Sequence, residues 1–116
     1  MKRIYLATPV NARKEKTMHA KLTAACKRVD EMQFYLAGIF PDAEFTSVFD
    51  SCVIAESEAT IMGWCVETVM SCDMIVLDDG WENSKGCTVE RFVAMQYGKQ
   101  VKTINSFKLA EQLKTK

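Results

Sequence analysis

The stretch that most constrains the fold of this chain is residues 72–99, which predict a strand, a polar loop and a helix in succession. An unbroken apolar run at 74–77 is flanked on both sides by aspartates, which is typical of a strand buried on both faces in a parallel sheet. Residues 80–86 contain Gly, Asn and Ser and cannot continue this strand. Apolar periodicity resumes at Val89 and stops at Gly98, which predicts a helix over 87–98.

The remainder of the chain alternates strand-like and helix-like segments in the same way. We predict strands at 4–7, 44–49 and 100–105 and helices at 14–37, 58–71 and 107–114. This alternation implies a parallel sheet with helices on both faces and right-handed crossovers. We therefore predict a single α/β domain over residues 1–116, a flavodoxin-like or Rossmann-like three-layer sandwich with a parallel sheet of about four strands.

The composition favours a protein of the cytoplasm. The 116 residues are 48% hydrophobic and 26% charged, which is ordinary for a soluble globular domain. No apolar run approaches the ~20 residues of a membrane span, and the first residues are too polar for a signal peptide. The five cysteines are odd in number and form no C-x-x-C pair, which favours reduced thiols over disulfides or a zinc site.

The charged residues and the single histidine restrict the partners. With only His19 available, a His-rich metal cluster is impossible. Residues 36–90 are predominantly acidic, which argues against a nucleic-acid groove, whereas both flanking segments are basic. Complementary subunits and chance explain this asymmetry equally well. Because a four-stranded sheet leaves an edge or a helical face to cover, we expect a homodimer.

Two predicted loops follow neighbouring strands and are expected to open onto one crevice at the carboxyl ends of the sheet. Standard phosphate-binding motifs are absent from both. Arg13, Asn11 and Ser84 are suitable donors to a phosphate, and the first N–H groups of the following helix add to them. The alternative is that the polar side chains only form turns and Arg13 is a solvated charge. The candidate ligand contacts in these loops are Thr8, Asn11, Arg13, Trp81, Ser84 and Gly86.

Glu90 is the candidate reactive group. We expect it in the first turn of the helix after the second loop, facing the crevice. A carboxylate in that position can attack an electrophilic sugar carbon and form a covalent ester. The alternative is an ordinary acid that complements the positive end of the helix dipole.

Three neighbouring residues have competing interpretations. Cys87 lies at the predicted helix start, where a thiol pKa is lowered, and is the rival nucleophile; a semi-buried, unreactive thiol is the simpler interpretation. Trp81 either stacks on a ligand ring or covers the loop against the protein. Asp73, just before its strand, is expected to anchor the preceding turn.

Several of these segments resemble one protein superfamily. The segments IYLATP at 4–9, CDMIVL at 72–77 and GWENSKGCTVE at 80–90, followed by A-x-x-x-G-K at 94–99, resemble the nucleoside 2-deoxyribosyltransferase-like superfamily. The resemblance is closest to its short, poorly characterised branch with a Gly-Trp-Glu-x-Ser-x-Gly loop. It covers most of the chain except roughly residues 38–60.

The resemblance implies a flavodoxin-type fold and an enzyme that cleaves the N-glycosidic bond of a nucleoside or nucleotide. Glu90, in the G-x-x-x-E element that begins at Gly86, would be the nucleophile that attacks C1′. Ser84 would contribute to phosphate binding, and Tyr5 would lie near the sugar. Such enzymes need no metal or cofactor, and they form homodimers or larger assemblies whose subunits complete each other's sites.

Two departures from the superfamily pattern matter. Thr8 stands where a glycine is usual, which narrows the room for a ligand near the backbone. Cys65 stands where these enzymes have an aspartate, and a general acid contributes on the order of 10²–10⁴-fold to a rate. Two alternatives to the enzyme therefore stay open: a nucleotide-binding module that has lost its general acid, and a dimeric interaction domain.

Overall fold

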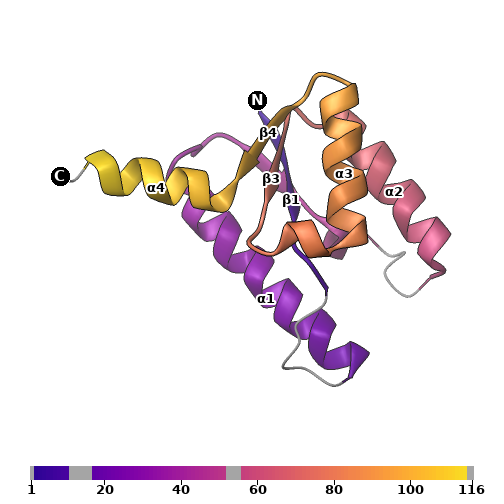
Figure 1. Ribbon diagram of the computed structural model, residues 1–116. Coiled ribbons are helices and arrows are strands. Elements are labelled where there is room, and N and C mark those ends of the chain that lie inside the picture. Colours follow the sequence, from indigo (N-terminus) through magenta and orange to yellow (C-terminus); the bar gives the residue numbers. More distant parts are fainter. Residues whose placement is uncertain (1, 11–16, 52–55, 115–116) are drawn as a thin grey trace.

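The computed structural model describes residues 2–10, 17–51 and 56–114 as an alternating series of strands and helices (Figure 1). The strands are β1 (Arg3–Ala7), β2 (Glu44–Thr46), β3 (Met74–Leu77) and β4 (Gln100–Thr103). The helices are α1 (Met18–Ala37), α2 (Glu58–Ser71), α3 (Lys85–Gln96) and α4 (Ile104–Lys114), with short 3-10 turns η1 (Val48–Asp50) and η2 (Trp81–Asn83).

All four described strands run parallel in one sheet, in the order β2-β1-β3-β4. Ile4 of β1 pairs with Phe45 on one side and with Met74 on the other, so β1 and β3 form the centre of the sheet. Helices α1 and α4 lie on one face and helices α2 and α3 on the other (Figure 1). The predicted α/β fold, with a parallel sheet of four strands between two helical layers, is confirmed.

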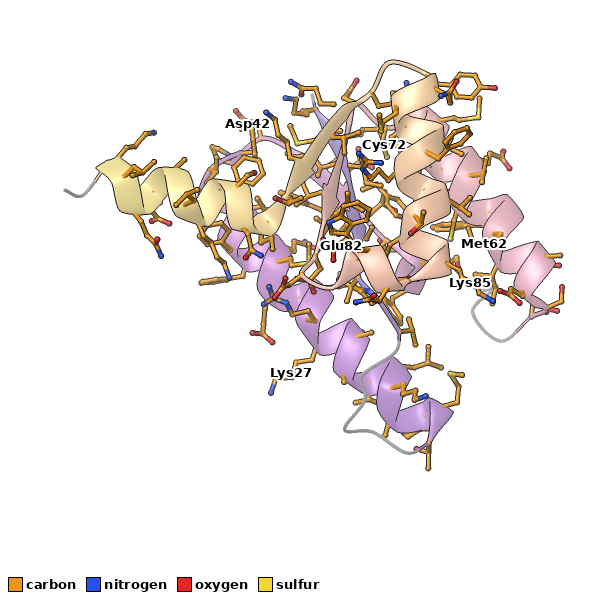
Figure 2. The ribbon with its side chains drawn as sticks, viewed as in Figure 1. Lys27, Asp42, Met62, Cys72, Glu82 and Lys85 are labelled. Carbon is orange, nitrogen blue, oxygen red and sulfur yellow. The ribbon has the colours of Figure 1, made fainter. Side chains whose placement is uncertain are left out.

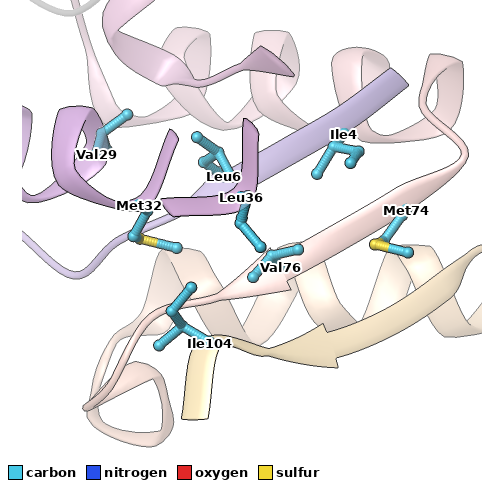
Figure 3. Close-up of a cluster of buried hydrophobic side chains, with 8 residues drawn as sticks. All are labelled: Ile4, Leu6, Val29, Met32, Leu36, Met74, Val76 and Ile104. Atoms are coloured by element: carbon cyan, nitrogen blue, oxygen red, sulfur yellow. The ribbon is translucent and has the colours of Figure 1, made fainter. Parts of the chain in front are cut away.

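Successive residues of β1 point to opposite faces of the sheet, as the pleat requires. Ile4 and Leu6 pack against α1, whereas Tyr5 and Ala7 pack against α2 and α3. The cluster on the α1 face is entirely hydrophobic (Figure 3) and contains Ile4, Leu6, Val29, Met32, Leu36, Met74, Val76 and Ile104. The cluster on the other face instead includes a tyrosine hydroxyl and two thiols.

Side-chain caps define where the helices begin. Thr17, Ser57 and Ser84 each accept a hydrogen bond from a backbone N–H in the first turn of α1, α2 and α3. Gly98, with φ of 70°, follows the end of α3 in the left-handed conformation that glycine adopts without strain. The prediction that Gly98 stops this helix is confirmed, and the last helical residue is Gln96.

Several predicted boundaries are wrong for local reasons. The strand at 44–49 ends at Thr46, because Ser47 and Asp50 form a capping box around η1. Strand β4 ends at Thr103, whose hydroxyl accepts from the N–H of Ser106 and caps α4. Helix α1 begins at Met18 after its cap, and the predicted residues 14–16 lie outside the described part of the chain.

Helix α3 begins two residues earlier than the periodicity predicts, at Lys85, because Ser84 is its cap. Gly86 consequently lies in the first helical turn and not in the loop. Glu90 lies in the second turn, and the prediction that it lies in the first turn is wrong. The helix dipole acts mainly on the first turn, so it does not account for a glutamate at this position.

Candidate active site

A cavity of about 640 Å³ opens at the carboxyl end of β1, between α2, α3 and the start of α1. Its floor is formed by Tyr5 and Ala7 of β1, and its walls are largely apolar side chains such as Met18, Leu22 and Ile61. Met62 of α2 lies beside the start of α3 at Lys85 (Figure 2), and both residues line the cavity. The site therefore lies where parallel sheets bind ligands, beyond the ends of their strands.

Glu90 is the buried carboxylate of this cavity. Its side chain lines the cavity wall although the residue is only 5% exposed. Burial raises the pKa of Glu90 from 4.5 to about 7, and hydrogen bonds from Tyr5 and Cys65 oppose that rise. Near neutral pH, Glu90 therefore exchanges readily between its protonated and ionised forms.

No cation compensates this carboxylate in the described part of the chain. The ion pairs found there are Arg3–Glu44, Arg28–Glu31 and Arg28–Asp78, and none of them includes Glu90. A buried carboxylate that serves only the fold is normally paired with a cation. Glu90 instead relies on two neutral donors, which leaves its oxygen atoms available to react.

Tyr5 and Cys65 surround Glu90 from two other elements, β1 and α2. Tyr5 is 1% exposed, and burial followed by the charge of Glu90 raises its pKa well above the usual value of 10. Cys65 is 3% exposed, and burial raises its thiol pKa to about 12, with a further contribution from Glu90. Both groups therefore stay protonated and donate to the carboxylate at physiological pH.

The predicted loop residues reach the cavity only in part. Thr8, Ser84 and Gly86 line it together with Tyr5 and Glu90. The Ser84 Oγ accepts from the N–H of Cys87 at 3.3 Å, and the Ser84 hydroxyl also hydrogen-bonds to the Cys87 side chain. The predicted contacts Asn11 and Arg13 lie outside the described residues.

Trp81 does not line this cavity. Its ring packs against the hydrophobic cluster under α2 and α3, and the Arg91 guanidinium lies 5.0 Å from its ring centre. A cation–π contact and apolar packing together hold the indole against the protein. Of the two interpretations of Trp81, the geometry favours the one in which it covers the η2 turn.

The surroundings of Cys87, the rival nucleophile, disfavour its thiolate form. It lies in the first turn of α3, where the helix dipole alone lowers a thiol pKa. Burial outweighs that effect and raises the pKa of Cys87 to about 12, so the thiolate is not formed near neutral pH. Asp73 was expected to anchor the preceding turn; its Oδ2 instead accepts from the backbone N–H of Arg3 at 2.8 Å and joins the starts of β1 and β3.

A second buried carboxylate, Asp78, was missed by the pattern of the sequence. It is 3% exposed at the end of β3, and both of its oxygens lie within 3.0 Å of the Nε atom of Arg28. Thr8 also donates to Asp78, at 3.4 Å. The sequence feature that could have indicated this pair is Arg28, a charged residue next to Ala25 and Val29 on the buried side of α1.

The arrangement of the strands and helices is an α/β fold of the deoxyribosyltransferase type. The solved structure of a "2-desoxiribosyltransferase from Leishmania mexicana" is similar to this chain with a TM-score of 0.64 and 20% sequence identity. The match covers 89% of this chain and 63% of that chain, so this chain spans less than two thirds of that protein. The fold expected from the resemblance to nucleoside 2-deoxyribosyltransferases is confirmed.

The chain belongs to the family described as "Domain of unknown function (DUF4406)", whose model matches residues 2–103. The matched region contains all the described residues that line the cavity, from Tyr5 to Glu90. No similar sequence was found among the curated proteins. Among the described helices, none has both the length and the apolar character needed to cross a membrane.

Proposed function

We propose that this protein cleaves the N-glycosidic bond of a nucleoside or nucleotide, with Glu90 as the nucleophile. The observation that carries the proposal is a buried carboxylate that lines a largely apolar cavity and has no cationic partner among the residues that the structure describes. Such a cavity accommodates a sugar and a base, and its buried carboxylate is suited to attack on an anomeric carbon.

In the first step an oxygen of Glu90 forms a bond to C1′ while the bond from C1′ to the base nitrogen breaks. The electron pair of that bond leaves with the base, which takes a proton from water. In the second step water, or a second base, attacks C1′ and breaks the ester, which restores the carboxylate. The attacking water gives up its proton to the solvent, and the net reaction is hydrolysis or sugar transfer.

Neighbouring groups fit the substrate contacts of this reaction. Ser84 and the first N–H groups of α3 are suited to bind a 5′-phosphate or a sugar hydroxyl. Tyr5 lies against Glu90 and would contact the sugar, and Thr8 and Gly86 would form walls. We propose that Asn11 and Arg13, which lie outside the described residues, supply further donors to the substrate.

The ionisation of Glu90 predicts how activity depends on pH. Only the ionised carboxylate is nucleophilic, and its pKa is about 7. Base release should therefore rise with pH through neutrality and level off above roughly pH 8. A rate that is flat between pH 5.5 and 8.5 would contradict this assignment of the nucleophile.

The test is release of free base from a panel of nucleosides and their 5′-phosphates, measured by chromatography. Glu90→Ala should abolish release, whereas Glu67→Ala, a loss of an exposed acid on α2, should not change it. Release that persists in Glu90→Ala would exclude Glu90 as the nucleophile.

A binding module is the second candidate, and the observation that favours it is Cys65. With a thiol pKa of about 12, Cys65 is not matched to act as a general acid at neutral pH. Under this alternative, nucleotides would raise the melting temperature by binding the native state, but no base would be released.

We also propose that the protein is a homodimer, through the outer face of α2 and α3. Val89, Phe92 and Met70 are exposed on this face, with Phe92 60% exposed. The exposed charges on α2 are acidic and those on α3 basic, so two copies related by a two-fold axis can pair α2 with the partner's α3. Phe92→Glu should yield monomers in light scattering, whereas Phe34→Glu on α1 should not.

We propose that the protein works in the cytoplasm. Cys26, Cys65, Cys72 and Cys87, the described cysteines, are all free thiols. Free thiols persist in a reducing compartment. Fractionation of cells that express the tagged chain tests this proposal.

A further inference from the structure

Glu90 and its two buried polar neighbours come from three different elements. Tyr5 is supplied by β1, Cys65 by α2 and Glu90 by α3, and each is no more than 5% exposed. All three line the same cavity. Buried polar groups that converge from separate elements must satisfy one another, because water is excluded from most of their surface.

Each neutral neighbour of Glu90 holds a hydrogen to donate. The hydroxyl of Tyr5 and the thiol of Cys65 both hydrogen-bond to the carboxylate, which is an acceptor when ionised. A carboxylate has two oxygens, so one donor leaves it free to rotate about its last bond, whereas two donors define its plane. Cys65 therefore supplies the second donor, which fixes the plane of the Glu90 carboxylate.

An aspartate at position 65 would disfavour the ionised form of Glu90. Two carboxylates in contact cannot both ionise near neutral pH, so an aspartate there would compete with Glu90 for one proton. A thiol has nearly the same reach but carries no charge. The residue that departs from the superfamily pattern is thus compatible with an ionised Glu90.

We propose that Cys65 is a positioning residue: its thiol donates to the Glu90 carboxylate and, together with the Tyr5 hydroxyl, holds it ionised and oriented toward the cavity. The proposal deepens the proposed function, since an oriented carboxylate is what a nucleophile requires. The other described titratable groups that line the cavity are Cys87 and Lys85 on α3, Glu58 on α2 and Glu56 before it.

The test is a pH titration of the Glu90 carboxyl carbon by NMR, in protein labelled with 13C-glutamate and without any substrate. The Glu90→Gln variant identifies the signal by its disappearance. Cys65→Val removes the donor and fills its space, Cys65→Ala removes it alone, and Cys65→Ser replaces it with a hydroxyl. Cys72→Ala is the matched control, because Cys72 is also buried on this face but does not contribute to the pKa of Glu90.

Cys65→Val and Cys65→Ala should raise the midpoint of the Glu90 titration by about one pH unit, a tenfold change in proton affinity. Cys65→Ser and Cys72→Ala should leave the midpoint within a few tenths of the wild type. Midpoints that do not move in Cys65→Val and Cys65→Ala, or that move as far in Cys72→Ala, would overturn the proposal. Because no substrate is present, the result is independent of whether the protein releases bases.

Discussion

Asp78 and Glu90 are both buried carboxylates, but they lie on opposite faces of one sheet and have opposite surroundings. Asp78 extends β3 on the α1 face, where Arg28 contacts both of its oxygens. Glu90 lies on the α2 and α3 face, where Tyr5 and Cys65 are the donors to it among the described residues. Breaking a paired buried charge destabilises the folded state strongly, whereas a buried charge without a cation is held at a cost to stability and remains reactive.

The hydrophobic clusters on the two faces of the sheet also differ in their polar groups. The cluster under α1 contains only hydrocarbon side chains and two thioethers, those of Met32 and Met74 (Figure 3). The cluster under α2 and α3 includes Tyr5, Cys72 and Cys87, and it borders the cavity. One face therefore supplies stability and the other carries the candidate chemistry.

The largest effect on stability is expected at the paired carboxylate. Asp78→Asn keeps the side-chain volume but leaves Arg28 without its buried partner, which should cost about 3 kcal/mol of unfolding free energy. Chemical denaturation at pH 7 measures it. The control is Glu31→Gln, which removes the more exposed partner of Arg28 at 3.8 Å and should cost less than about 0.5 kcal/mol. Equal costs for the two variants would contradict the comparison.

Glu90, in contrast to Asp78, should lower the stability of the fold when it is ionised. The folded-state pKa of Glu90 lies above the unfolded value, so its protonated form stabilises the fold at low pH. This contribution is lost as pH rises from about 4.5 to 7. Relative to Glu90→Gln, the wild type should lose roughly 2–3 kcal/mol of stability between pH 5 and pH 8. A constant difference between the two proteins over this range would refute the assigned surroundings of Glu90.

A smaller effect is expected at the cap of α3. Ser84→Ala should cost about 1 kcal/mol through the lost helix cap, and the same holds for Ser57→Ala on α2. Only Ser84 lines the cavity, so only Ser84→Ala should also weaken the melting-temperature shift caused by nucleoside 5′-phosphates. A similar loss of that shift in both variants would argue against a ligand contact by Ser84.

The smallest effect is expected at Gly86. A Cβ there would lie 3.8 Å from Met62 Sδ, an ordinary contact, and alanine is the better helix former. Gly86→Ala should therefore stabilise the fold by about 0.5–1 kcal/mol. The same methyl group lies at the cavity wall, and reduced base release from a more stable protein would indicate close approach of the ligand. Unchanged release would exclude Gly86 from the ligand contacts.

The fold could be predicted because its signals are local and periodic. The apolar run at 74–77, the stripe of α1 and the alternation of elements each depend on burial patterns that the sequence displays directly. The helix boundaries were less predictable because polar caps decide them. Ser84, interpreted as a loop residue, caps α3, so the helix begins two residues earlier and Glu90 lies in its second turn.

The site was predictable where a motif carried it and not where tertiary contacts made it. Glu90 and Ser84 follow from the loop that precedes the helix, and both line the cavity. The Arg28–Asp78 pair joins residues 50 positions apart, which no local pattern reveals. Cys65 was recognised only as a departure from the superfamily, since its contact with Glu90 depends on how α2 packs on α3.

The most direct test of the central claim is intact-mass spectrometry of the protein, mixed with a deoxynucleoside or its 5′-phosphate and quenched in acid. If Glu90 attacks C1′, the wild type should carry the mass of one sugar, with or without its phosphate, and peptide mapping should place it on Glu90. The same mixture with Glu90→Gln should show no added mass and no free base. Free base released by Glu90→Gln, or a sugar attached at another residue, would contradict the account.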